Sequence, residues 1–178
     1  PGVVRLVGHC LVACDPPGRL DDAVKVFASA RGATDAARDR RLVRRFGADL
    51  VVSEMVASAG LVQGTRLSRE RGAGDGSPQV IQLAGCEPGP MGEAARVAED
   101  MGADIVDINM GCPMKKVVNG YAGSALMRQE DLALRLIEAT LSGTSRPVTL
   151  KMRTGWDEDS RNAPSLAARA VAAGIAAV

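Results

Sequence analysis

Short apolar runs alternate with longer amphipathic stretches along most of this chain. The apolar runs are rich in β-branched residues and bounded by Gly or Pro, which is typical of buried strands. We expect strands at residues 24–30, 50–55, 80–84, 105–108 and 147–152. Between them, apolar positions recurring with the period of a helix predict helices at residues 34–46, 91–101, 130–141 and 164–173. This alternation is that of a parallel α/β sheet.

One phrase repeats where a helix gives way to a strand. Residues 46–51 read FGADLV, residues 101–106 read MGADIV, and residues 173–178 read AGIAAV, a weaker third copy. In each copy a glycine ends the helix and an apolar strand follows. The third copy therefore predicts the start of a sixth strand.

Two architectures share this alternation: open dinucleotide-binding sheets and (β/α)8 barrels. No Gly-x-Gly-x-x-Gly follows any expected strand, which argues against the first. Polar residues stand instead at the ends of several strands, as in barrel active sites. These residues are Ser53, Glu54, Gln82, Asn109, Cys112, Lys151 and Arg153. We predict an α/β fold, an incomplete TIM (β/α)8 barrel of about five to six βα units, because a whole barrel needs ~250 residues.

Composition and charge set few further bounds. Residues 1–23 lack periodicity and are expected to form a loose N-terminal segment, with the partial barrel at residues 24–178. The net charge of +1 neither requires nor excludes a nucleic acid partner. No apolar run approaches the ~20 residues of a membrane span, so we expect no membrane partner. The four cysteines are irregularly spaced, which favours free thiols in the cytoplasm and no metal site.

The most informative stretch is residues 105–127, IVDINMGCPMKKVVNGYAGSALM. It places Cys112 directly after a buried strand, with Asn109 before it and Pro113 after it. A thiol at that end of an α/β strand points to function rather than to packing alone. One role for it is that of a thiolate nucleophile, which would need a histidine base. The one histidine is His9, in the N-terminal segment, which argues against that role.

Two further strands carry polar residues that need partners. Gln82 lies inside an apolar strand, where its amide must bind either a ligand or neighbouring backbone. Lys151 and Arg153 alternate with apolar residues, so both point to one side of their strand. If that side is the interior, they need an anionic or electron-rich partner, and if it is the outside they are solvated.

Three segments together resemble one enzyme family. They are residues 109–126 of the cysteine segment, residues 80–87 (VIQLAGCE) and residues 149–156 (TLKMRTGW). The chain resembles the tRNA-dihydrouridine synthases, closest to their bacterial B-type members. That resemblance implies a flavin-binding TIM barrel that reduces the C5=C6 bond of uridine in tRNA. It also implies FMN as cofactor, NADPH or NADH as reductant, and tRNA as partner.

The resemblance assigns roles to particular residues. Cys112 is implied as the proton donor, and Gln82, Lys151 and Asn109 as contacts of the cofactor. Lys115, Lys116 and Arg153 are candidates for contacts with tRNA, as are the arginines between positions 38 and 45. The glycines Gly120 and Gly123 would let the loop after the cysteine approach a ligand closely.

The resemblance is incomplete at both ends of the chain. The family's first-strand flavin segment corresponds to residues 28–35, ASARGATD, where its Pro-Met step is absent. The later barrel strands and the helical tRNA-binding domain of the family would lie beyond residue 178, so we expect this fragment alone to be inactive. Two alternatives remain: another flavin-dependent barrel reductase, related to dihydroorotate or dihydropyrimidine dehydrogenases, and a non-catalytic RNA-binding remnant.

Overall fold

A parallel sheet forms the centre of the protein. The computed structural model describes residues 3–7, 10–14, 40–41, 44–45, 50–74, 76 and 78–178. The sheet has four strands in the order β4-β5-β6-β7: Val56–Ala57, Val80–Ala84, Ile105–Met110 and Val148–Met152. All neighbouring strands are parallel. The predicted strands at 80–84, 105–108 and 147–152 are confirmed, with β6 extending two residues further than expected.

Helices follow the strands along the chain. The long ones are α5 (Pro88–Asp100), α7 (Glu130–Gly143) and α8 (Ala163–Ala173), as the periodicity predicted. Short helices that were not predicted are α3 (Ser58–Val62), α4 (Arg66–Gly72), α6 (Lys115–Val118) and the 3-10 helix η1 (Gly123–Arg128). They are too short for a helical period to stand out. Within the described ranges, no helix is long and apolar enough to cross a membrane.

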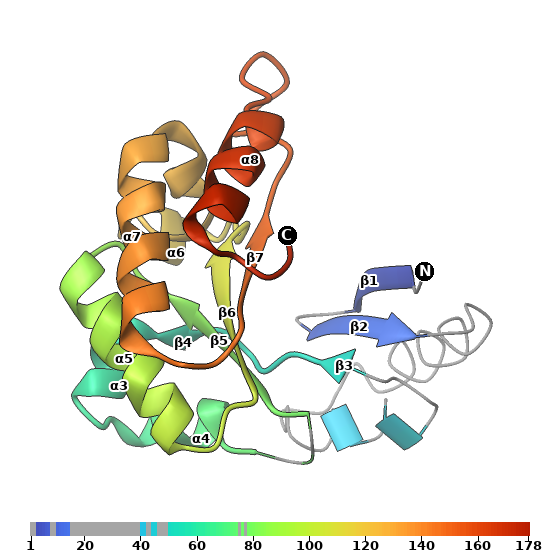
Figure 1. The fold of residues 1–178 in the computed structure, drawn as a ribbon, viewed down its shortest axis with the longest axis vertical. Coiled ribbons are helices and arrows are strands. Elements are labelled where there is room, and N and C mark those ends of the chain that lie inside the picture. The colour runs from blue at the N-terminus through green and yellow to red at the C-terminus, as the bar shows by residue number, and fades with distance from the viewer. Residues whose placement is uncertain are drawn as a thin grey trace.

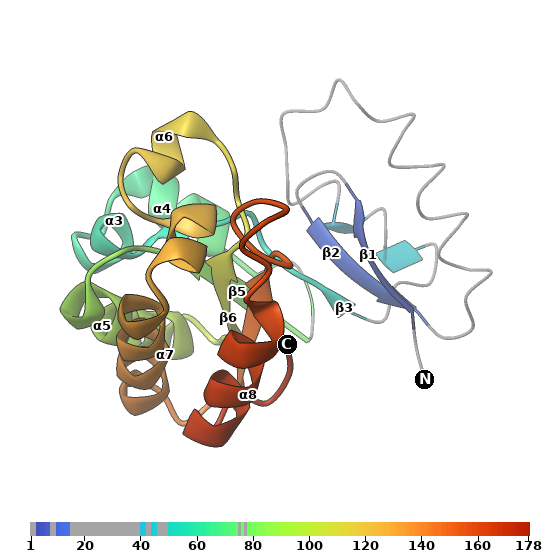
Figure 2. The same ribbon diagram turned by 90° about the horizontal axis from the view of Figure 1, so that it is seen from above.

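The sheet has two faces of different character. Helices α5, α7 and α8 cover one face, and the opposite face is turned toward the N-terminal strands (Figures 1 and 2). Alternate strand residues such as Leu83 and Ile108 enter the apolar core beneath the helices. Because side chains alternate along a strand, Gln82 and Asp107 project from the other face. We call this second surface the inner face.

Helices α5 and α7 approach each other backbone to backbone. A Cβ added at Gly143 would overlap the carbonyl oxygen of Gly92 and lie 2.9 Å from its Cα. A Cβ at Gly92 would in turn lie 2.9 Å from the carbonyl oxygen of Ala139. Both positions therefore require glycine for this helix spacing.

The third copy of the repeat begins a further strand, as predicted. Ala177 pairs with Thr149 in a parallel bridge, and the N–H of Ala176 donates to the carbonyl of Val148 at 2.8 Å. The glycine before it, Gly174, has a φ of +117°, and Gly102 in the second copy has +90°. The α/β class with a parallel sheet is thus confirmed. The arrangement is consistent with part of a TIM barrel, and closure into a barrel stays a prediction.

The N-terminal region departs from expectation. Strands β1 (Val3–Val7) and β2 (Cys10–Cys14) pair antiparallel, so a loose segment is the wrong description for these residues. Strand β2 also pairs antiparallel with β3 (Leu50–Val51). Of the expected strand at 50–55, only Leu50–Val51 forms a strand, and Val52 makes an isolated parallel bridge to Val80. Strand β4 begins after it, at Val56.

Other expectations concern residues outside the described part. The strand predicted at 24–30 lies wholly outside it. The helix predicted at 34–46 is represented by residues 40–41 and 44–45, which are helical.

Candidate functional site

Polar side chains on the inner face form a hydrogen-bonded network across β5, β6 and β7. Gln82 Nε2 donates to Asp107 Oδ2 at 2.7 Å, and Asn109 Nδ2 donates to Gln82 Oε1 at 2.8 Å. These three residues are only 3–4% exposed. On the far side, Thr149 Oγ1 donates to Asp107 Oδ1 at 2.6 Å. The parallel register produces the network, because it places Gln82 and Thr149 on either side of Asp107.

Two members of this network, Thr149 and Asp107, were not among the expected site residues. Burial raises the pKa of the Asp107 carboxyl group to about 6, and this effect exceeds the opposing effects of the bonds from Thr149 and Gln82 and of the positive charge of Lys151. At neutral pH the group is still mainly ionised. A signal was present in the sequence: Asp107 and Asn109 stand two residues apart in an otherwise apolar strand, and so share one face.

Cys112 lies where the chain leaves β6, and Asn109 holds it there. Asn109 Oδ1 accepts the backbone N–H groups of Gly111 at 3.2 Å and of Cys112 at 3.0 Å. The cysteine is partly exposed and not in a disulfide. Its carbonyl oxygen accepts the N–H of Ser124 at 3.0 Å. The expected position of the thiol at the carboxyl end of a strand is therefore confirmed.

The loop after Cys112 folds back against it at Gly123. This glycine has a φ of +62°, and a Cβ there would lie 2.6 Å from the carbonyl oxygen of Cys112. It would also lie 2.9 Å from Cγ1 of Val117. The close approach that glycine permits here is thus to the cysteine itself. Two residues earlier, Tyr121 has a φ of +56° and is 66% exposed.

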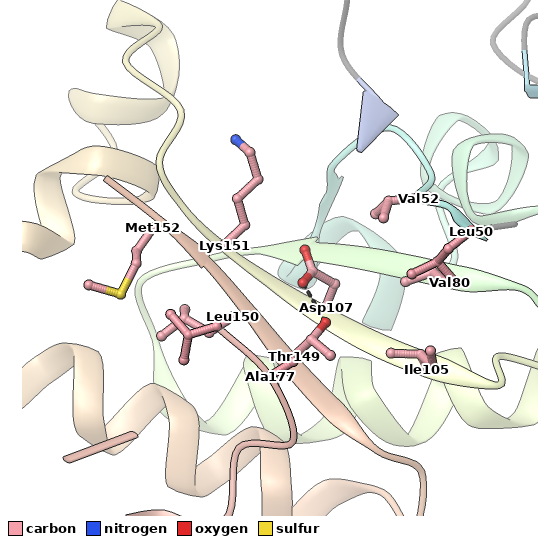
Figure 3. Close-up of a pocket in the computed structure, with 11 residues that line it drawn as sticks. Leu50, Val52, Val80, Ile105, Asp107, Thr149, Leu150, Lys151, Met152 and Ala177 are labelled. Carbon is pink, nitrogen blue, oxygen red and sulfur yellow. Dashed lines mark hydrogen bonds between the residues drawn. The ribbon is translucent and has the colours of Figure 1, made fainter. Parts of the chain in front are cut away.

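Lys151 lies on the inner face, which resolves the alternative left open by the sequence. Together with Asp107 and Thr149 it lines an open hollow of about 320 Å³ (Figure 3). The other residues of the hollow are apolar: Leu50, Val52, Val80, Ile105, Leu150, Met152, Ala177 and Val178. A Cβ at Gly111 would lie 3.4 Å from Lys151 Nζ, so the ammonium group reaches the start of the cysteine loop.

The structure brings some of the expected site residues together and leaves others apart. Gln82, Asn109 and Lys151 share the inner face, with Asn109 opposite Lys151 in the register, and Cys112 follows at the carboxyl end of β6. Gln82 has partners for both amide atoms within the network, so its polarity alone does not require a ligand.

Among the expected tRNA contacts, Arg153 lies beside the cysteine loop, since a Cβ at Gly111 would lie 3.7 Å from its Cγ. Lys115 and Arg153 are exposed, and the side chain of Lys116 is outside the described part of the structure. Two of the arginines bind backbone: Arg40 donates to the carbonyl of Ala73 at 3.4 Å, and Arg44 to that of Pro78 at 2.7 Å. Arg40 is buried, so its side chain is not exposed for the tRNA contact suggested for this group of arginines. Among the described residues, no group of three or more Cys, His, Asp or Glu is placed to hold a metal ion.

Comparison with known proteins identifies the family. The profile of the dihydrouridine synthase family matches residues 28–178. The chain is 58% identical to a probable tRNA-dihydrouridine synthase of Rhizobium leguminosarum over 151 residues, which are 84% of this chain and 47% of that protein. It is 54% identical over 160 residues to a probable tRNA-dihydrouridine synthase of Rhodobacter capsulatus, covering 88% of this chain and 49% of the relative.

A B-type relative is similar at the same level. The tRNA-dihydrouridine synthase B of Xanthomonas campestris is 50% identical over 155 residues, which are 86% of this chain and 46% of that protein. The chain spans about half the length of the curated relatives it matches. These matches confirm the resemblance that the cysteine segment suggested. The chain belongs to the dihydrouridine synthase family.

Proposed function

We propose that this chain is part of the catalytic barrel of a tRNA-dihydrouridine synthase that reduces the C5=C6 bond of uridine in tRNA. The observation that carries the proposal is the position of Cys112. Asn109, whose side chain lies on the face that carries Gln82 and Lys151, accepts the backbone N–H of Cys112 at the carboxyl end of β6. Relatives that share half or more of their aligned residues with the chain are named for this activity.

FMN fits the chemistry of this face. The amide nitrogens of Gln82 and Asn109 each keep one N–H beyond the network, and Lys151 adds a positive charge. Such donors suit the carbonyl and ring-nitrogen acceptors of a flavin, so these three residues would hold the cofactor. When bound, FMN would supply the hydride, which no side chain can provide.

Cys112 would supply the proton. A thiol can donate to one carbon of the double bond as hydride reaches the other, which is general acid catalysis. Asn109 contributes by fixing the backbone of the cysteine and so keeping the thiol at the strand end. Lys115, Lys116 and Arg153 would contact tRNA phosphates, and NADPH or NADH would reduce the cofactor.

The activity can be tested with a chimeric protein. Because the chain covers 49% of the Rhodobacter capsulatus relative, it would be joined to the part of that relative it does not cover. With FMN and NADPH, we expect the chimera to form dihydrouridine in unmodified tRNA transcripts, detected by mass spectrometry of the nucleosides. Free uridine and orotate should stay unreduced. Reduction of the free pyrimidines but not of tRNA would instead identify a barrel reductase of another substrate class.

The role of Lys151 gives a separate prediction. Lys151→Met in the chimera should weaken FMN binding by about 10- to 100-fold, the usual value of one charge-assisted contact. The bound flavin spectrum should shift as well, because a nearby cation stabilises the anionic reduced ring. Titration followed by absorbance measures both. Lys115→Met is the matched control, since Lys115 is exposed on α6. Equal FMN affinity in the two variants would place Lys151 outside the cofactor site.

A further inference from the structure

We propose that Asp107 is a positioning residue that fixes the orientation of the Gln82 and Asn109 amides and, through them, the backbone of the Cys112 loop. The orientation of the two amides follows from the hydrogen-bond network itself. The effect of this orientation on uridine reduction rests on the proposed function.

One end of the network can only accept hydrogen bonds and the other can only donate them, which sets the donor-to-acceptor direction of every bond between them. At one end, the ionised carboxylate of Asp107 can only accept hydrogen bonds. At the other end, the backbone N–H groups of Gly111 and Cys112 can only donate them. Each amide between these ends has one donor and one acceptor atom. Every bond is satisfied only if Gln82 turns its nitrogen to Asp107 and Asn109 turns its oxygen to the cysteine loop.

Turning either amide over would place two acceptors or two donors against each other within a buried network. A turned Gln82 would place its oxygen against a carboxylate oxygen, and a turned Asn109 would place its nitrogen against two N–H groups. Buried polar atoms without a suitable partner are costly. The carboxylate on β6 therefore reinforces, across two amides, the orientation in which Asn109 Oδ1 accepts the N–H of Cys112.

The surroundings of Asp107 keep it in the accepting state. Gln82 on β5 and Thr149 on β7 each donate to one carboxylate oxygen. Lys151, also on β7, is the charged group that favours ionisation, and burial opposes it. The balance leaves the pKa of Asp107 at about 6. Below that value the group gains a proton and can present either a donor or an acceptor to Gln82.

A consequence concerns what the inner face offers to a ligand. Both amide oxygens accept hydrogen bonds inside the network. Gln82 Oε1 accepts from Asn109 Nδ2, and Asn109 Oδ1 accepts from the N–H groups of Gly111 and Cys112. The nitrogens of Gln82 and Asn109 each retain one N–H. With Lys151 on the same face, this surface presents donors. It suits the acceptor edge of a ring that carries carbonyl groups.

The test follows amide hydrogen exchange in the chain, resolved by residue with NMR. Asp107→Asn removes the acceptor-only group, because the new amide can turn either atom to Gln82. We expect exchange at Gly111 and Cys112 to become about 5-fold faster or more, as a lost hydrogen bond allows. Rates in α5 and α7 should stay unchanged. Asp159→Asn is the control, since it makes the same carboxylate-to-amide change at an exposed position outside the network and should not alter the two amides.

A rescue variant separates orientation from simple structural damage. In Asp107→Asn/Gln82→Glu the acceptor-only carboxylate moves to β5, where it must accept from Asn109 Nδ2. Asn109 Oδ1 then faces the cysteine loop again, so exchange at Gly111 and Cys112 should return to within about 2-fold of the parent rate. Unchanged exchange in the single variant would overturn the proposal. So would faster exchange throughout the protein without rescue.

The unmutated chain provides a second measurement that needs no variant to fold. After correction for intrinsic rates, protection of the Gly111 and Cys112 amides should fall relative to α7 as the pH drops below about 6, because Asp107 becomes protonated. A protection ratio that stays constant between pH 5 and 7.5 would contradict the proposal. Neither measurement uses tRNA or a reductant. An inactive chimera would therefore refute the function without affecting this inference, and the reverse also holds.

Discussion

Uridine reduction is expected to slow by roughly 10²- to 10⁴-fold when Cys112 is replaced with Ala, the usual contribution of a general acid. The change removes the thiol and keeps the backbone N–H that Asn109 binds. FMN binding, flavin reduction by NADPH and tRNA binding should therefore persist. Single-turnover formation of dihydrouridine by the chimera measures the loss.

Cys86 provides the matched control for this variant. It is also free and partly buried, and it follows strand β5. Cys86→Ala should retain the parent rate, because the proposed chemistry assigns it no proton. If Cys112→Ala also reduced uridine at the parent rate, another group would have to deliver the proton and the assignment would be wrong.

The contact between α5 and α7 predicts the largest effect on stability. Gly143→Ala would place a methyl group onto the carbonyl oxygen of Gly92, and backbone cannot move aside as a flexible side chain can. The helices would have to separate, at a cost near the upper end of the ~1–3 kcal/mol typical of overpacking, or beyond it. Urea or thermal unfolding of the chain would measure the change in the free energy of unfolding.

Gly89→Ala is the corresponding control within α5. No atom lies within 4 Å of a Cβ at Gly89, so the substitution meets open space. Alanine favours a helix over glycine by up to ~1 kcal/mol, whereas Pro90 disfavours helical backbone in an alanine that precedes it. These two effects oppose each other, so we expect a change in stability well below that of Gly143→Ala. Equal unfolding free energies for the two variants would show that the helices tolerate a wider spacing.

Local patterns were sufficient to predict the elements that position the site. The strands at 80–84 and 105–108 and the helix at 130–141 follow from apolar periodicity, which each segment carries by itself. The position of Cys112 at a strand end follows in the same way. The motif around it led to the family, which the comparisons confirm.

Two features of the fold could not be obtained from such patterns. The pairing of β2 with β3 joins Cys10–Cys14 to Leu50–Val51, which are far apart along the chain. A strand pattern alone does not name its partner, so it did not show that only Leu50 and Val51 of the expected strand at 50–55 pair with β2. The short helices α3, α4 and α6 depend on the turns that tertiary contacts impose on the chain between strand ends.

By itself, the sequence determined which residues form strands β5, β6 and β7, that Cys112 follows β6, and which family the chain resembles, because these properties reside in contiguous residues. Only the tertiary structure decided that Lys151 faces inward and that Asp107 joins Gln82 and Thr149. Those partners lie 25 and 42 residues from Asp107 along the chain. Their meeting depends on the parallel register of three strands. Register is set by the packing of the whole sheet against its helices, so no single segment encodes it.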